Sequence, residues 1–308
     1  MGHDHGAHGH THAVGPGTDA RRLGFALALI VAFLVAEVVA GILAHSLALL
    51  SDAAHMLTDA GALLLALVVL RLIRRPAAGN VTYGLQRMDV LSAQANGATL
   101  LVLGAILVYG GIRHLISPPS SNGTVMLIVA LVGIGVNALA TRQLAQANRS
   151  SLNIEGAFQH LLTDLFAFLV TAVAGVVIIV TGFDRADAIA ALVIACVMLR
   201  SAVSLLRASG RVLLEMAPER VEVAEIGQVM AAHAGVIEVH DLHVWEISSG
   251  FSALSAHVLV DPGADCHAIR RELEALLDER YGIDHTTLQV DHAHEGRLLQ
   301  IGDAPQAH

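Results

Sequence analysis

The sequence predicts an α-helical membrane protein with six transmembrane helices, followed by a small α+β domain in the cytoplasm. Three observations predict this fold class. Of the 308 residues, 55% are hydrophobic and 15% are charged, and the mean hydropathy of +0.63 is too high for an ordinary soluble protein. Six apolar segments have about the 20-residue length that a bilayer requires. After about Leu213 the pattern changes to the shorter amphipathic segments of a soluble domain.

Composition and charge exclude several classes of protein. The formal net charge of −9, most of it in the polar C-terminal third, argues against nucleic-acid binding. The two cysteines, Cys196 and Cys266, form no disulfide framework. The N-terminus lacks the basic region, apolar stretch and cleavage site of a signal peptide, so we expect it to be retained.

Residues 1–20 are predicted to be a disordered, His-rich N-terminal tail, because they are too polar and too rich in glycine to build a core. Its histidines are His3, His5, His8, His10 and His12. Such a tract either binds metal weakly or is a solvated arm with no required role, and composition leaves both interpretations open.

Residues 21–211 are predicted to form a six-helix transmembrane domain. The expected spans are 23–44, 47–72, 88–114, 124–146, 155–181 and 186–208. Arginines gather before the first span and after the second, fourth and sixth, whereas the opposite side of the bilayer holds only Arg113 and Arg185. The positive-inside rule then places both termini in the cytoplasm.

Residues 212–295 are predicted to form the α+β domain, and residues 296–308 a second disordered tail. The periodicity gives helix, strand, strand, helix and strand, expected at 219–233 (after Pro218), 236–247, 251–260, 265–281 and 286–290. This order predicts a two-layer structure in which helices cover one face of a sheet.

Two matching pairs of metal-binding residues lie inside the apolar segments. His55 and Asp59 are four residues apart, and so are His160 and Asp164, so each pair shares one helix face. Two imidazoles and two carboxylates suit a divalent cation of the zinc type. The alternative is that each histidine and aspartate form a structural hydrogen bond. A duplicated ligand pattern at membrane depth favours the metal site.

Other polar residues and glycines in the spans have simpler interpretations. Asp52 either attracts cations at the outer end of its span or lies in a wet vestibule. Glu37, Asn96 and Asn137 are expected to form hydrogen bonds between helices. Five glycines are expected to permit close helix packing: Gly104, Gly110, Gly111, Gly133 and Gly135.

Several ordered motifs resemble the cation diffusion facilitator family of zinc exporters. They are Glu37 with Gly41, the run from Ser46 to Asp59, the run from Thr82 to Leu91 with Asn96, the run from His160 to Asp164, and the run from His240 to Trp245. The resemblance covers residues 23 to 292. The chain departs from it at Asp89, where the family usually has glutamate.

The resemblance implies a homodimeric, proton-coupled antiporter with a metallochaperone-like (ferredoxin-like) cytoplasmic domain for metal binding and dimerisation. It implies that His55, Asp59, His160 and Asp164 form the transport site. No cofactor is expected, and Zn²⁺ is both the transported substrate and a regulator bound in the cytoplasmic domain. The expected location is the bacterial inner (cell) membrane, with several crossings of the lipid bilayer.

The chemistry of these ligands predicts zinc efflux coupled to proton entry, because protons compete with metal for histidine and aspartate. A broader exporter of Cd²⁺, Co²⁺, Fe²⁺ or Ni²⁺ is an alternative, since the same ligands accept several metals. An intramembrane zinc enzyme would need an open coordination position and a general base. A passive channel would need weaker ligands and fast release.

A second metal site is expected in the cytoplasmic domain. His240 and His257 lie on consecutive strands and fall nearly opposite each other if the turn at 248–250 sets the register. The resemblance adds His267 and Asp291 as candidate ligands, whereas Gln289 occupies another common ligand position. Surface histidines on a purely structural domain are the alternative interpretation. His243, His285 and His294 are weaker candidates, and Trp245 is expected to pack.

Overall fold

The computed structural model describes residues 16–43, 47–118 and 122–293. Within helices α1 and α2 it leaves undescribed the side chains of 16–18, 37, 40–41, 43, 47–55 and 58. The chain divides into two compact units, Met1–Gly210 and Arg211–His308.

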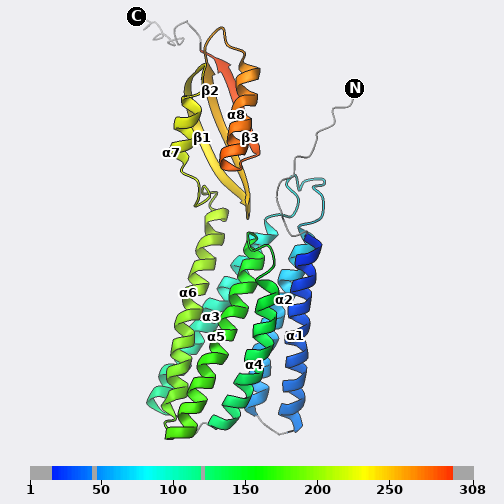
Figure 1. Cartoon of the computed structure of the whole chain (residues 1–308), viewed down its shortest axis with the longest axis vertical. Coiled ribbons are helices and arrows are strands. Elements are labelled where there is room, and N and C mark those ends of the chain that lie inside the picture. The colour runs from blue at the N-terminus through cyan, green and yellow to red at the C-terminus, as the bar shows by residue number, and fades with distance from the viewer. Residues whose placement is uncertain (1–15, 44–46, 119–121, 294–308) are drawn as a thin grey trace, which may run out of the picture. The chain divides into compact units, whose positions relative to one another are not determined.

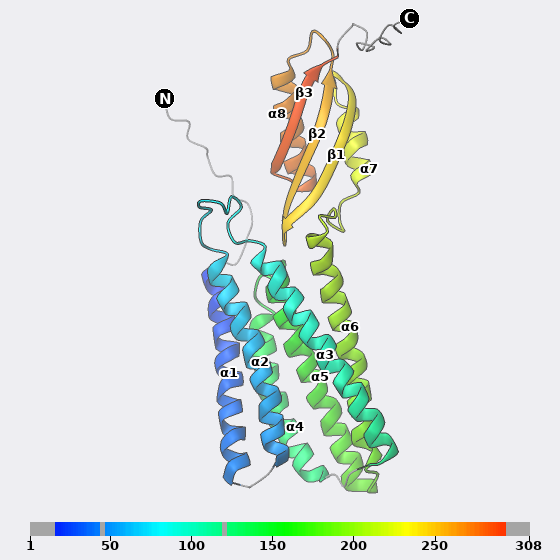
Figure 2. The ribbon, with the colours of Figure 1, turned by 180° about the vertical axis from the view of Figure 1, so that it is seen from behind.

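The first unit is a bundle of helices that run side by side (Figures 1 and 2). Its helices are α1 (Pro16–Leu43), α2 (Leu47–Leu72), α3 (Met88–Ile116), α4 (Gly123–Leu144), α5 (Leu152–Thr181) and α6 (Arg185–Leu213). Among the described residues, α3 to α6 are long and apolar enough to cross a membrane. Helices α1 and α2 have 28 and 26 residues, a comparable length.

Helix α1 starts earlier than predicted. Residues 16–20 were expected to belong to the disordered tail, but they form the first turn of α1. Pro16 fits a first helical position because its missing N–H has no partner there. The buried carboxylate of Asp19 accepts a hydrogen bond from Asn148 N–H (3.2 Å), which joins this turn to the segment before α5. The predicted tail at 1–15, with its histidines, lies outside the described residues.

Glycines of α3 let α6 approach closely. They recur every seven residues, and each meets a leucine of α6: Gly97 meets Leu206, Gly104 meets Leu199, and Gly111 meets Leu192. A Cβ added at Gly104 would lie 2.8 Å from Cδ2 of Leu199, so a larger residue does not fit without movement. This is the small-residue packing expected between membrane helices.

Only part of the glycine prediction is confirmed. Gly104, Gly111 and Gly133 lie at close helix contacts, and a Cβ at Gly133 would be 2.5 Å from the ring of Phe168. By contrast, a Cβ at Gly110 or Gly135 would meet no atom within 4 Å in the described structure. Both positions were predicted from composition alone, which does not reveal which helix face a glycine occupies.

The second unit is a two-layer α+β domain. Its elements are α7 (Val223–Ala231), β1 (Val236–Ser248), β2 (Phe251–Val260), α8 (Cys266–Tyr281) and β3 (His285–His292). The sheet order is β1-β2-β3, with β1 antiparallel and β3 parallel to β2. Figures 1 and 2 show both helices on the same face of the sheet, as predicted. Ile226, Met230, Leu254, Val258 and Leu273 fill the core between the layers.

The first helix of this domain is shorter than predicted. It was expected to follow Pro218 and run to His233, but α7 begins only at Val223. Residues 218–221 instead form a turn in which Val221 N–H donates to Pro218 O (3.0 Å). Apolar periodicity does not reveal such a turn, since Val221 and Val223 both pack against the core.

Candidate functional site

Three of the four predicted transport-site residues come together in the helix bundle. Asp59 of α2 and His160 and Asp164 of α5 are 4%, 1% and 7% exposed. His160 Nε2 lies 2.9 Å from Asp59 Oδ1 and 3.7 Å from Asp164 Oδ2. One ligand atom from each residue lies within 4.8 Å of the others. The three side chains can therefore bind a single cation together.

His55 is the fourth predicted ligand. It belongs to α2 one turn before Asp59, and its side chain lies outside the described residues. The side chains of Asp52, Glu37 and Thr58 are outside them as well.

The first turn of α5 is fixed by side chains of the neighbouring helix α3. Ser151 is the N-cap and accepts from Ile154 N–H (3.4 Å). Asp89 Oδ1 accepts from Ser151 Oγ (2.7 Å) and from Asn153 N–H (3.2 Å). A carboxylate at a helix N-terminus satisfies free N–H groups and is favoured by the helix dipole. The shorter aspartate at position 89 therefore still anchors the helix that carries His160.

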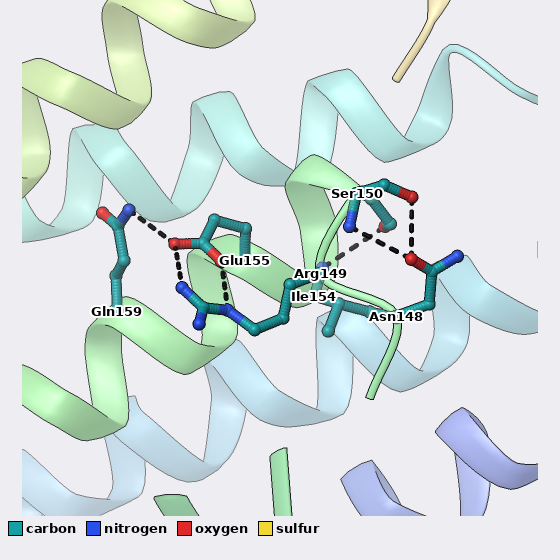
Figure 3. Close-up of polar contacts among 7 residues, drawn as sticks. Asn148, Arg149, Ser150, Ile154, Glu155 and Gln159 are labelled. Atoms are coloured by element: carbon teal, nitrogen blue, oxygen red, sulfur yellow. Dashed lines mark hydrogen bonds and ion pairs between the residues drawn. The ribbon is translucent and has the colours of Figure 1, made fainter. Parts of the chain in front are cut away.

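Arg149, in the segment before α5, forms an ion pair with Glu155 in the first turn of that helix (Figure 3). Its Nε and NH2 groups donate to the two carboxylate oxygens of Glu155 at 2.7 and 3.0 Å, and Gln159 Nε2 donates to the same carboxylate at 2.9 Å. The guanidinium carbon lies 3.9 Å from the ring centroid of the buried Phe158. The hydrogen bond with Glu155 raises the pKa of Arg149 above its ordinary value, so this residue stays charged.

Two polar residues of the spans differ from expectation. Asn137 Nδ2 donates to Gly133 O (3.2 Å) within its own helix α4, not to another helix. Among the described atoms, Oδ1 of Asn96 and Oδ1 of Asn137 are buried without a hydrogen-bond partner. Asparagine can bond to the carbonyl one turn earlier in its own helix, which composition does not reveal. Among the described residues, neither Oδ1 atom forms the helix-to-helix bond that was expected, and Asn137 Nδ2 bonds within its own helix.

A second group of possible metal ligands lies in the cytoplasmic domain. His240 of β1 pairs with His257 of β2, and their ring centroids are 5.3 Å apart. Asp241 joins them, with Oδ2 at 3.7 Å from His257 Nδ1. The Nδ1 atom of His240 is buried and has no hydrogen bond from any residue that the structure describes, although Glu238 Oε1 lies 3.4 Å away. His240, Asp241 and His257 each place one ligand atom within 4.8 Å of the others.

A β-bulge brings Asp241 into this group. The register shifts between His240 and His243, and Asp241 has a positive φ of 50°. In a regular strand, residue 241 would point to the face opposite His240. The bulge turns it back toward His257. Sequence reasoning missed Asp241 for this reason, although it stands next to a predicted ligand.

The other predicted ligands of this domain lie elsewhere. His267 is exposed in the first turn of α8, and Asp291 is exposed on β3 opposite Leu259. Gln289, on β3, is the register partner of His257 and donates to Asp291 Oδ2 (2.8 Å). Neither His267 nor Asp291 belongs to the group of three among the residues that the structure describes. His294 lies outside those residues.

Comparison with known proteins decides the family. Residues 23–214 match the family described as the cation efflux transmembrane domain, and residues 218–293 match the cation efflux protein cytoplasmic domain. The chain belongs to the cation diffusion facilitator family. The predicted fold class is thereby confirmed, with a membrane domain of the six-helix family type followed by a small α+β domain.

Bacterial relatives match this family member over nearly its whole length. It is 33% identical over 307 residues to the "Cadmium, cobalt and zinc/H(+)-K(+) antiporter" of Bacillus subtilis, covering 97% of this chain and 96% of that one. It is 37% identical to the "Metal cation efflux system protein CzcD" of Cupriavidus metallidurans, covering 92% and 89%. The "Zinc transporter ZitB" of Shigella flexneri is 35% identical, with 93% of each chain covered.

These matches establish the general activity of the family member. It is a membrane transporter that exports divalent metal cations, which are its substrates, and not an enzyme.

Proposed function

We propose that this transporter exports Zn²⁺ from the cytoplasm in exchange for protons, through a site formed by His55, Asp59, His160 and Asp164. The observation that carries the proposal is the buried cluster of Asp59, His160 and Asp164. Ionisable groups at membrane depth are costly and mark substrate pathways. His55 completes the donor set because it is one turn from Asp59 on the same helix.

Proton coupling follows from the donor chemistry. Neutral imidazole and ionised carboxylate bind metal, and a proton on either group removes a ligand. If the site opens alternately to each side, an acidic exterior displaces the metal outward and protons return inward. Rigid-body movement of helices around a fixed central site is the general route for such exchange.

Zinc flux into proteoliposomes containing a pH-sensitive dye tests this proposal. We expect Asp59→Asn to lower zinc flux by at least about a hundredfold, because loss of a residue that only supports a metal ligand already costs up to about that much, and to abolish the accompanying proton flux. Asp278→Asn, an exposed carboxylate of α8, is the control and is expected to transport normally. Normal flux in Asp59→Asn contradicts the proposed site. Zinc flux that persists unchanged without a pH gradient and moves no protons contradicts the coupling. A zinc flux that reaches a maximum as zinc concentration rises indicates a carrier, whereas a flux that keeps rising indicates a channel.

A broader metal specificity is the second candidate function. The relatives above include one named for cadmium, cobalt and zinc, and two histidines with two aspartates accept several divalent metals. Flux of Zn²⁺, Cd²⁺, Co²⁺, Fe²⁺ and Ni²⁺ through the same proteoliposomes ranks them. Equal rates for zinc and cadmium would favour this candidate over a zinc-selective exporter.

We also propose the arrangement of the protein in the cell. The match to the family's cytoplasmic domain supports a homodimer, and the arginine distribution supports cytoplasmic N- and C-termini in a bacterial inner membrane. The proposed domains are an N-terminal tail, a transport domain at 21–211, a cytoplasmic domain at 212–295 and a C-terminal tail at 296–308. The N-terminal tail was predicted at 1–20, and the start of α1 at Pro16 shortens it to 1–15.

The group of His240, Asp241 and His257 is proposed to bind zinc as a regulator of transport. Two imidazoles and a carboxylate fit zinc, and the buried Nδ1 of His240 has no hydrogen bond among the described residues. His267 and Asp291 are retained as candidates to complete the ligand set.

A further inference from the structure

A hydrogen bond between α2 and α5 lies two helical turns from the transport site. Asn153 Nδ2 of α5 donates to Ala66 O of α2 at 2.9 Å, and Asn153 is 3% exposed. Asn153 precedes His160 by seven residues, and Ala66 follows Asp59 by seven. The helices run in opposite directions in the bundle (Figures 1 and 2). The Asn153–Ala66 contact therefore has the same helix register as the contact between His160 and Asp59.

The amide of Asn153 is held in one orientation. The carbonyl oxygen of Ala66 can only accept a hydrogen bond, so Nδ2 must be the atom that faces it. Oδ1 then faces Ser92 of α3 and accepts from its Oγ at 2.7 Å. The backbone N–H of Asn153 donates to Asp89 of α3 at 3.2 Å. Helix α3 thus fixes both the main chain and the side chain of Asn153, and that side chain fixes α2.

Register matters because the transport ligands come from two helices. Within one helix the spacing of His160 and Asp164 is set by the backbone, but their distance to Asp59 depends on how α2 and α5 slide along each other. A shift of one residue changes the level by about 1.5 Å. Metal–ligand distances in proteins vary by only about 0.2 Å around their ideal values. A slip of one residue between α2 and α5 is therefore large enough to remove Asp59 from a site shared with His160 and Asp164.

We propose that Asn153 is a positioning residue for metal transport, which holds α2 and α5 in the register that sets Asp59 against His160. The proposal rests on the proposed transport site. Asn153 does not bind the metal, since it lies about 10.5 Å along the helix from His160.

Asn153→Ala and the matched variant Asn137→Ala test the proposal on the full-length protein. Both residues are buried asparagines, at 3% and 1% exposure, that donate to a backbone carbonyl, but Asn137 donates within its own helix. One readout is the zinc KM and maximal rate in proteoliposomes. The other is the ligand-field absorption of Co²⁺ bound at the transport site, which Asp59→Asn is expected to remove. We expect Asn153→Ala to raise the KM about tenfold, equivalent to about 1.4 kcal/mol, and to weaken this absorption. Asn137→Ala is expected to change neither by more than about twofold.

The outcomes separate this inference from the proposed site. If Asp59→Asn abolishes flux while Asn153→Ala behaves like Asn137→Ala, only the positioning role is overturned. A loss of maximal rate with unchanged KM and absorption overturns it too, because it indicates general destabilisation. If Asp59→Asn transports normally, the site and the positioning role both fail. Should Asn153→Ala not fold, Asn153→Ser keeps a small polar group and is expected to raise the KM in the same direction, and an unchanged KM overturns the proposal.

Discussion

At the residue scale, Thr163 shows why matching sequence positions do not always share a role with the ligands beside them. It is 3% exposed and lies next to Asp164, in a motif that matches the one around Asp59. Its hydroxyl donates to Gln159 O at 2.8 Å, one turn earlier in α5. This bond satisfies a buried hydroxyl within its own helix. In this structure Thr163 therefore has a local structural bond, and the proposed ligand is its neighbour Asp164.

Glu246 of β1 is predicted to make the stability of the cytoplasmic domain depend on pH. Burial raises the pKa of its carboxyl above the ordinary value, against the opposing effects of the Gly250 N–H and of Arg220 and Arg211. The folded state then holds this proton more tightly than the unfolded state. The contribution of Glu246 to stability is complete below its ordinary pKa, about 4.3, and is lost as pH rises through the raised value.

Glu246→Gln, which cannot ionise, is therefore expected to stabilise the antiparallel pair of β1 and β2 at neutral pH relative to wild type. Amide exchange of residues 236–260 in the full-length protein measures this at pH 4 and pH 7. Slower exchange in the variant should be seen at pH 7 and should diminish at pH 4. Glu279→Gln removes an exposed carboxylate of α8 and serves as the control. An equal difference from wild type at both pH values would show that ionisation of Glu246 is not its cause.

At the scale of elements, two glycines of α4 give opposite predictions although they are two residues apart. A Cβ at Gly133 would lie 2.5 Å from the Phe168 ring of α5, whereas at Gly135 it would meet no described atom within 4 Å. Gly133→Ala should destabilise the bundle by about 1–3 kcal/mol through overpacking. Gly135→Ala should be neutral or stabilise the helix by up to about 1 kcal/mol.

Thermal unfolding of the purified protein in detergent measures both variants. The expected order of melting temperature places Gly135→Ala at or above wild type and Gly133→Ala below it. Equal melting temperatures for the two variants would mean that the contact between α4 and α5 adjusts to the added methyl group.

The same scale shows what could be predicted from sequence. Apolar length and periodicity predicted the helices and strands, because burial imposes a period on each element. Hydropathy did not predict the start of α1 at Pro16, since a polar first turn is held by Asp19 and Asn148. The spacing of His160 and Asp164 predicted a shared face. Contacts between elements could not be predicted from sequence. The hydrogen bond of Asn153 with Ala66 depends on the register of two helices, and the approach of Asp241 to His257 depends on a β-bulge.

At the scale of the whole molecule, two groups of possible metal ligands suit two different tasks. The cluster of Asp59, His160 and Asp164 is buried in the bundle, whereas Asp241 and His257 are exposed and His240 is half-buried in the cytoplasmic domain. A buried site releases its ion only after a conformational change. An accessible site can equilibrate with cytoplasmic zinc. A metal that binds one conformation of a transporter more tightly shifts the population toward it.

Removing the cytoplasmic ligands should therefore change the zinc dependence of transport and spare its maximal rate. For His240→Ala/His257→Ala, we expect flux at low zinc to fall about fivefold, the low end of couplings between linked sites, with normal flux at saturating zinc. His233→Ala is the matched control, because it removes a histidine of the same domain that pairs with Glu272 and belongs to no proposed ligand set. The measurement is initial zinc flux in proteoliposomes over a range of zinc concentrations. An unchanged zinc dependence in the double variant would contradict the regulatory role. An equal effect of His233→Ala would contradict it as well, because that change removes no proposed ligand.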